Sequence, residues 1–370
     1  MARKQKDVET PPQTAEATGD APRSPREVER GILHVGVDLG TSRSAIACSN
    51  GVRECVGSLV GWPRDNVSSK VLGRRVLFGD EALEHRLSLD LVSPLARGNL
   101  VYPGLEGDEK ARSRQAAEEL VRHLRTLCRP RHDQIVYAVI GAPAQASTEN
   151  KQALVEMARV AGLDSVMVVS EPFSVAYGID ALDEAIIIDI GAGTIDLCRM
   201  HGTLPEVEDQ ITIFKAGDHI DGELSRLIKK RYADAQFSRN MVKKAKERFS
   251  GVVDTSDRAL VTFPVEGRPT ELDVTEEIQA AVRSIVPEIL QSVQKLVASF
   301  DPEFQHRIRN RVFVSGGGSQ IYGLQKALEE GMEQIGGGNV FLVQEPVYAG
   351  ANGALKLARE MPAEYWEQLN

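Results

Sequence analysis

Residues 185–194 read AIIIDIGAGT, and a similar stretch, ILHVGVDLGT, occupies residues 32–41. In each, an apolar, β-branched run ends in an aspartate followed by glycine and threonine, and a second strand-like run comes directly after. This pattern predicts a β-hairpin whose turn consists of glycine and small hydroxyl residues. Asp189 lies 151 positions after Asp38 (189 − 38). The recurrence predicts an internal duplication, with two related domains that face one another.

Strands and helices are predicted to alternate around the two hairpins. An apolar run over 134–140 predicts a strand, and apolar spacing over 148–161 predicts a helix. A short strand over 166–169 leads into a second helix, for which Ser170 is the predicted N-terminal cap. The alternation indicates an α/β fold class.

The second half of the chain contains a longer periodic segment. Residues 273–299 predict one amphipathic helix, with Asp273 and Glu276 as a capping box and a kink at Pro287. Residues 348–359 are rich in glycine and alanine and predict a helix suited to close packing between domains.

We predict three parts of the chain from these patterns. Residues 1–29 are rich in proline, threonine, alanine and mixed charge, and we expect them to be a disordered tail. The first domain is expected over 30–185, with 352–370 returning to it, and the second over 186–351.

Composition excludes several classes of protein. The chain has 370 residues, 42% of them hydrophobic, and a formal net charge of −9, which argues against a nucleic-acid binder with a broad basic face. No apolar run approaches the ~20 residues that span a bilayer, and no signal peptide is apparent. We therefore expect a cytoplasmic protein without direct membrane insertion. Four cysteines lack metal-ligand spacing and are expected to be buried free thiols: Cys48, Cys55, Cys128 and Cys198.

The two turns have the composition of a polyphosphate site. Backbone N–H donors approach phosphate closely where glycine and small hydroxyl residues make the turn. The candidate residues are Gly40, Thr41, Ser42, Gly191, Ala192, Gly193 and Thr194. Asp38 and Asp189 would repel phosphate but suit a magnesium ion, bound through its water shell. The alternative is that both segments are simple tight β-turns.

Two further elements add to this candidate site. Gly316-Gly317-Gly318-Ser319 follows a predicted strand and lets the backbone pass flat against a ligand. Glu171 begins a helix, where it either orients a water for attack on a phosphate or stabilises the helix dipole. The chain has no Walker-type or Rossmann glycine motif, no nucleophile elbow and no zinc-like histidine spacing.

In chain order, the Asp38 turn, residues 141–143, residues 170–173, the Asp189 turn and the Gly316 segment resemble the actin, sugar kinase and heat-shock chaperone ATPase superfamily. Within it, the chain is most similar to the bacterial actins that align magnetosomes. The segments with this similarity are 168–173, 188–194, 208–210, 215–217, 312–319 and 362–366.

The resemblance implies an actin-like fold of two facing RNase H-like domains, with ATP or ADP and Mg²⁺ in the cleft between them. It implies that Glu171 and Asp189 are catalytic and that residues 316–319 contact the adenosine. Lys246 and Glu247 match a helix that flanks the adenine and ribose. The implied partner is the protein itself, in a cytoskeletal filament, together with adaptor proteins on magnetosomes or vesicles.

Three functions remain open from the residues. The first is an ATPase that polymerises with Mg-ATP and uses hydrolysis for filament turnover. We expect this rather than a chaperone, because no peptide-binding domain follows the last predicted helix. The second is a small-molecule kinase or phosphatase of the same superfamily, which needs an additional carboxylate base. The third is an adaptor that binds nucleotide without hydrolysing it.

Overall fold

The computed structural model describes residues 31–253 and 257–369, and two five-stranded sheets organise it. The first contains β1 (Ile32–Leu39), β2 (Arg43–Cys48), β3 (Arg53–Gly57), β9 (Ile135–Ala142) and β10 (Ser165–Ser170), in the order β10-β9-β1-β2-β3. The second contains β11 (Ala185–Ile190), β12 (Ile195–Met200), β13 (Gln210–Ile213), β16 (Val312–Ser315) and β17 (Val340–Leu342).

The two sheets have the same topology. The order in the second sheet is β17-β16-β11-β12-β13. In each sheet, the first two strands in the chain form an antiparallel hairpin, and a third antiparallel strand pairs with the second. Two parallel strands lie on the other side of the first strand. Both predicted hairpins and the α/β fold class are therefore confirmed. The predicted disordered tail lies outside the described residues, and the proposed domain boundaries stay predictions.

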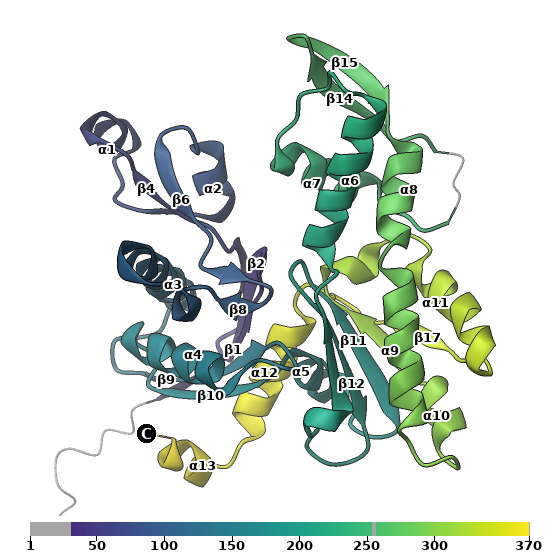
Figure 1. Cartoon of the computed structure of the whole chain (residues 1–370). Coiled ribbons are helices and arrows are strands. Elements are labelled where there is room, and N and C mark those ends of the chain that lie inside the picture. The colour runs from purple at the N-terminus through teal and green to yellow at the C-terminus, as the bar shows by residue number, and fades with distance from the viewer. Residues whose placement is uncertain (1–30, 254–256, 370) are drawn as a thin grey trace, which may run out of the picture.

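Each sheet is part of one lobe (Figure 1). The first lobe adds α1 (Asn66–Leu72), α2 (Gly79–Glu84), α3 (Gly107–Leu127) and α4 (Thr148–Val160), and the short strands β4 (Val60–Pro63), β5 (Leu77–Phe78), β6 (Leu89–Val92), β7 (Leu95–Ala96) and β8 (Asn99–Leu100). The second lobe adds α6 (Gly217–Arg231), α7 (Arg239–Phe249), α8 (Thr275–Arg283), α9 (Val286–Ala298), α10 (Gln305–Arg309), α11 (Leu324–Met332) and the hairpin of β14 (Leu260–Val265) and β15 (Arg268–Asp273). Separate apolar cores fill the two lobes.

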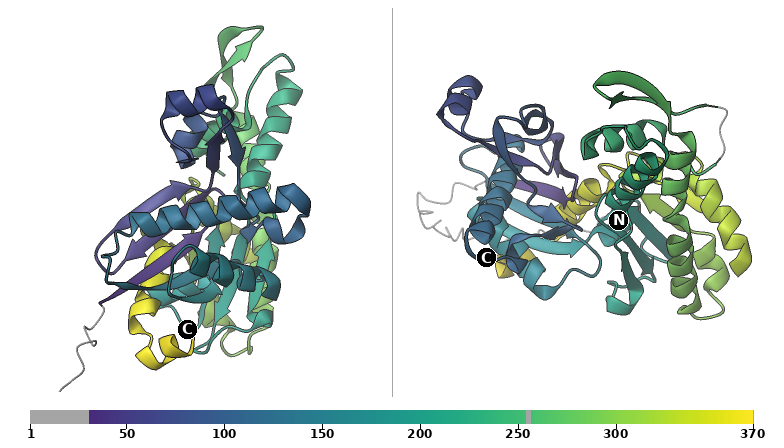
Figure 2. Two further views of the ribbon diagram at one scale, coloured as in Figure 1. Left: turned by 90° about the vertical axis from the view of Figure 1, so that its left-hand side faces the viewer. Right: turned by 45° about the horizontal axis from the view of Figure 1, so that its top comes forward.

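Two helices lie between the lobes, as two views agree (Figures 1 and 2). They are α5 (Glu171–Gly178) and α12 (Ala349–Glu360), and α13 (Ala363–Gln368) follows α12. Glycines let α5 and α12 approach closely, because a Cβ at Gly353 would lie 1.7 Å from the carbonyl oxygen of Ser174. The glycine- and alanine-rich composition of this segment is thus explained by packing. Trp366 of α13 stacks on Tyr137 of β9 and is buried.

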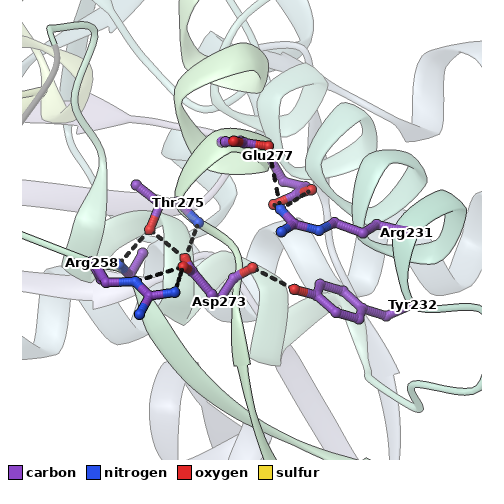
Figure 3. A network of polar contacts seen from close by, with 8 residues as sticks. Arg231, Tyr232, Arg258, Asp273, Thr275 and Glu277 are labelled. Atoms are coloured by element: carbon purple, nitrogen blue, oxygen red, sulfur yellow. Dashed lines mark hydrogen bonds and ion pairs between the residues drawn. The ribbon is translucent and has the colours of Figure 1, made fainter.

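The predicted helix over 273–299 is two helices, and its capping box is absent. α8 ends at Arg283 because Pro287 lacks an N–H and its ring would clash with the carbonyl four residues earlier. Asp273 belongs to β15, where its carboxylate accepts hydrogen bonds from Thr275 and pairs with Arg258 (Figure 3). Ser170 takes the N-cap position of α5, but its side chain makes no capping bond.

The cysteines are the free thiols expected from the sequence, but one of the four is not buried as expected. All four cysteines are free, and all but Cys55 are buried. Among the described residues, no helix is both long enough and apolar enough to cross a bilayer.

Candidate functional site

A cleft of about 350 Å³ lies between the lobes and gathers the predicted site residues from five separate parts of the chain. Those that line it are Asp38, Gly40, Thr41, Ser42, Glu171, Asp189, Gly191, Ala192, Gly193, Thr194, Lys246, Glu247, Gly316, Gly317 and Gly318. Ser319 does not line it. Its side chain is buried, and its hydroxyl donates to the carbonyl of Gly316, so it stabilises the glycine turn from behind.

The two hairpin turns meet at one end of the cleft. A Cβ at Gly193 would lie 2.2 Å from the hydroxyl oxygen of Thr41 and 2.7 Å from the Cα of Arg97, so only glycine fits there. The N–H of Gly98, from the β7–β8 turn, donates to the Thr41 hydroxyl at 2.7 Å. Backbone from three segments thus surrounds a small volume, as the binding of a polyphosphate requires.

Four carboxylates lie together beside these turns. Glu171 is the first residue of α5, and Asp189 and Asp196 are opposite one another on β11 and β12. Burial raises the pKa of Glu171 well above its ordinary range, and the charges of Asp38, Asp196 and Asp189 raise it further. Burial likewise raises the pKa of Asp38 to about 6 and that of Asp189 to about 8. The cluster therefore favours a bound proton or cation.

Asp196 is a member of this cluster that was not predicted from the sequence. It is 1% exposed, and one carboxylate oxygen accepts from the backbone of Ala144 at 2.8 Å and from the Thr212 hydroxyl at 2.6 Å. Its second oxygen has no partner among the described residues. A charged residue inside the apolar run Ile195–Cys198 was the signal that could have revealed it.

The carboxylates fit magnesium bound through water rather than a cage of protein ligands. Within the described part of the chain, no three acidic, histidine or cysteine side chains are placed to hold a metal together. Mg²⁺ usually retains several waters and takes one or two carboxylates plus phosphate oxygens. Asp38 and Asp189 line the cleft beside the turns, and a divalent cation would stabilise the charged carboxylates, which burial disfavours and whose pKa values burial raises.

Helices α6 and α7 form the opposite wall of the cleft. Lys246 of α7 pairs with Asp221 of α6 at 2.7 Å and donates to the carbonyl of Gly217 at 3.0 Å. Its predicted neighbour Glu247 lines the same wall. Ile321 and Val347 add apolar surface near the Gly316 turn, and neither was predicted. An apolar surface next to polar groups suits a flat base.

The two lobes also touch each other around the cleft. The ammonium of Lys243, on α7, donates to the hydroxyl of Ser42 in the first hairpin turn. The guanidinium of Arg97 lies 5.3 Å from the ring centre of Phe214. The relative position of the lobes therefore depends on groups at the rim of the site.

Comparisons with known proteins agree with this geometry. The profile of the family described as MreB/Mbl protein matches residues 111–364. The actin-like protein MamK of Paramagnetospirillum magneticum is 40% identical over 337 residues, which is 91% of this chain and 95% of that protein.

Solved structures show the same similarity. A MamK double helical filament has a TM-score of 0.86 at 39% identity and covers 90% of this chain and 100% of its own. A non-polymerising mutant of MamK bound to AMPPNP has a TM-score of 0.68 at 40% identity, with the same coverage. These relatives have an actin-like fold, as expected from the sequence.

Proposed function

Because this chain belongs to the MreB/Mbl protein family, we propose that it is an actin-like ATPase that polymerises with Mg-ATP into filaments and positions magnetosomes. The observation that supports ATP as the ligand is the meeting of two hairpin turns, from two sheets of the same topology, at one cleft, with Glu171 beside them. Self-association is supported by the filament structure of a relative that matches 90% of the chain. Adaptor proteins on magnetosomes would be further partners, and a cytoplasmic filament the location.

Different residues of the cleft would bind the phosphates, the adenosine and the magnesium ion. The N–H groups of the two turns bind the phosphate chain, and residues 316–318 with Lys246 and Glu247 hold the adenosine. Asp38 and Asp189 would hold Mg²⁺ through its waters, and the ion would neutralise phosphate charge.

Glu171 would orient the attacking water and accept its proton. A carboxylate whose pKa is raised by burial and by neighbouring charges takes up a proton more readily than an ordinary one. The buried position at the start of α5 also prevents the side chain from turning away into solvent.

Polymerisation is tested by sedimentation and light scattering. We expect the protein to pellet with Mg-ATP and to remain in the supernatant without nucleotide. A protein that stays monomeric at high micromolar concentration with Mg-ATP contradicts the proposal. The matched family and MamK relatives do not favour a small-molecule kinase, and strong stimulation of ATP turnover by a sugar or acyl substrate would reverse that conclusion.

The role of Glu171 is tested by Glu171→Gln. Loss of a general base lowers catalysis roughly 10²- to 10⁴-fold. We expect phosphate release to fall in that range, while ATP binding and assembly persist. Normal phosphate release by this variant would remove Glu171 from the catalytic step.

A further inference from the structure

Lys243 spans the cleft from the second lobe to the first. It lies on α7, and its ammonium donates to the hydroxyl of Ser42, which is in the turn between β1 and β2. Both residues line the cleft. A side chain of α7 therefore reaches the turn that is expected to hold phosphate.

Lys243 forms no direct ion pair within the described residues, and the Asp221 carboxylate, which is paired with Lys246 one turn further along α7, interacts with its charge only at longer range. The contact of Lys243 with Ser42 is to a neutral hydroxyl. An ammonium has three N–H donors, so two remain after this bond.

We propose that Lys243 is a cross-cleft clasp, whose ammonium binds the phosphate chain of the nucleotide and draws α7 toward the first lobe. This rests on the proposed function, because it assumes that the cleft binds ATP. Phosphate is the chemistry that matches the site, because a half-buried cation without a direct ion pair lies against a turn rich in backbone donors. Because Lys243 and the first hairpin turn would then bind the same phosphate chain, closure of the two lobes would depend on the phosphates of the nucleotide.

The adjacent Lys244 provides a matched control. It has the same side chain on the same helix, but it is exposed and does not line the cleft. The variants Lys243→Met and Lys244→Met therefore remove the same charge, one from a position that lines the cleft and the other from an exposed position outside it. Lys243→Arg keeps the charge and the reach, and it serves as the variant that retains the fold if the methionine is not tolerated.

The test is titration of each variant with fluorescent ATP and, separately, with adenosine by calorimetry. Hydrogen bonds to charged groups have a strength that corresponds to roughly 10- to 100-fold in affinity. We expect Lys243→Met to lose that much ATP affinity, Lys243→Arg to lose little, and adenosine affinity to stay the same. Lys244→Met should bind both ligands like the wild type.

Two results would overturn the clasp. One is unchanged ATP affinity in Lys243→Met, and the other is an equal loss for adenosine, which would mean that Lys243 acts on the base or on the lobe itself. A wild-type protein that binds no ATP would instead refute the proposed function, so the two failures are distinguishable.

Discussion

The substitution Gly316→Ala should destabilise the protein before any nucleotide is added. Gly316 has a φ of +77°, and a Cβ there would lie 2.5 Å from the carbonyl oxygen of Ile190 and 2.8 Å from a carboxylate oxygen of Asp189. Gly316 combines φ +77° with ψ 172°, a conformation that is essentially restricted to glycine and costs an L-residue about 1–3 kcal/mol, and overpacking against backbone adds about 1–3 kcal/mol. We expect a total loss of roughly 2–6 kcal/mol in the free energy of unfolding.

The neighbouring Gly317 separates this effect from binding. A Cβ at Gly317 would meet nothing within 4 Å, although the residue lines the cleft. Gly317→Ala should therefore leave the stability of the nucleotide-free protein within about 0.5 kcal/mol of wild type. It should weaken ATP binding, because the added methyl group would occupy space beside the ligand.

Denaturant unfolding without nucleotide, followed by circular dichroism, measures the first effect, and fluorescent-ATP titration measures the second. A Gly316→Ala protein as stable as the wild type would refute the packing argument. So would an equal loss of stability in Gly317→Ala.

Two further predictions concern charge and packing. The pKa of Asp38 is raised to about 6 and that of Asp189 to about 8, whereas both are near 4 when unfolded, so the folded state binds more protons between these values. The nucleotide-free protein should therefore lose stability as the pH rises from about 4 to 8, and Mg²⁺ should bind more tightly over the same range. Thermal unfolding of the wild type and of Asp189→Asn at each pH, without and with Mg²⁺, measures both effects. If the melting temperatures of the two proteins depend equally on pH, the raised pKa of Asp189 is contradicted. Gly353→Ala should destabilise by at least about 3 kcal/mol because its methyl group would overlap the Ser174 carbonyl, whereas Gly222→Ala, in an open position on α6, should be neutral or stabilising by about 0.5–1 kcal/mol. Thermal unfolding of the two variants side by side decides this, and similar melting temperatures would show that α5 and α12 can move apart.

Local patterns were sufficient for the two hairpins, their aspartate-glycine turns and several of the helices. Alternating apolar residues, aspartate-glycine turns and their recurrence depend on neighbours in the chain, so they are visible without a structure. The same local reasoning failed at Asp273, whose carboxylate binds Thr275 and Arg258 within a hairpin that was not predicted. It also joined α8 and α9, because the apolar periodicity continues across residues 284–285, where the helix is interrupted.

The pair of aspartate turns, and with it the duplicated α/β fold, is therefore determined by the sequence alone. Which residues of the two lobes face one another across the cleft is decided only by the tertiary structure. Asp196 meets Ala144 across 52 positions and Lys243 meets Ser42 across 201, and no spacing rule connects residues so distant. Ser319 shows the converse, since a residue within a recognised motif turns its hydroxyl to its own backbone and away from the cleft. Contacts between lobes depend on how two separately folded cores pack together, and that packing is not encoded in any single segment.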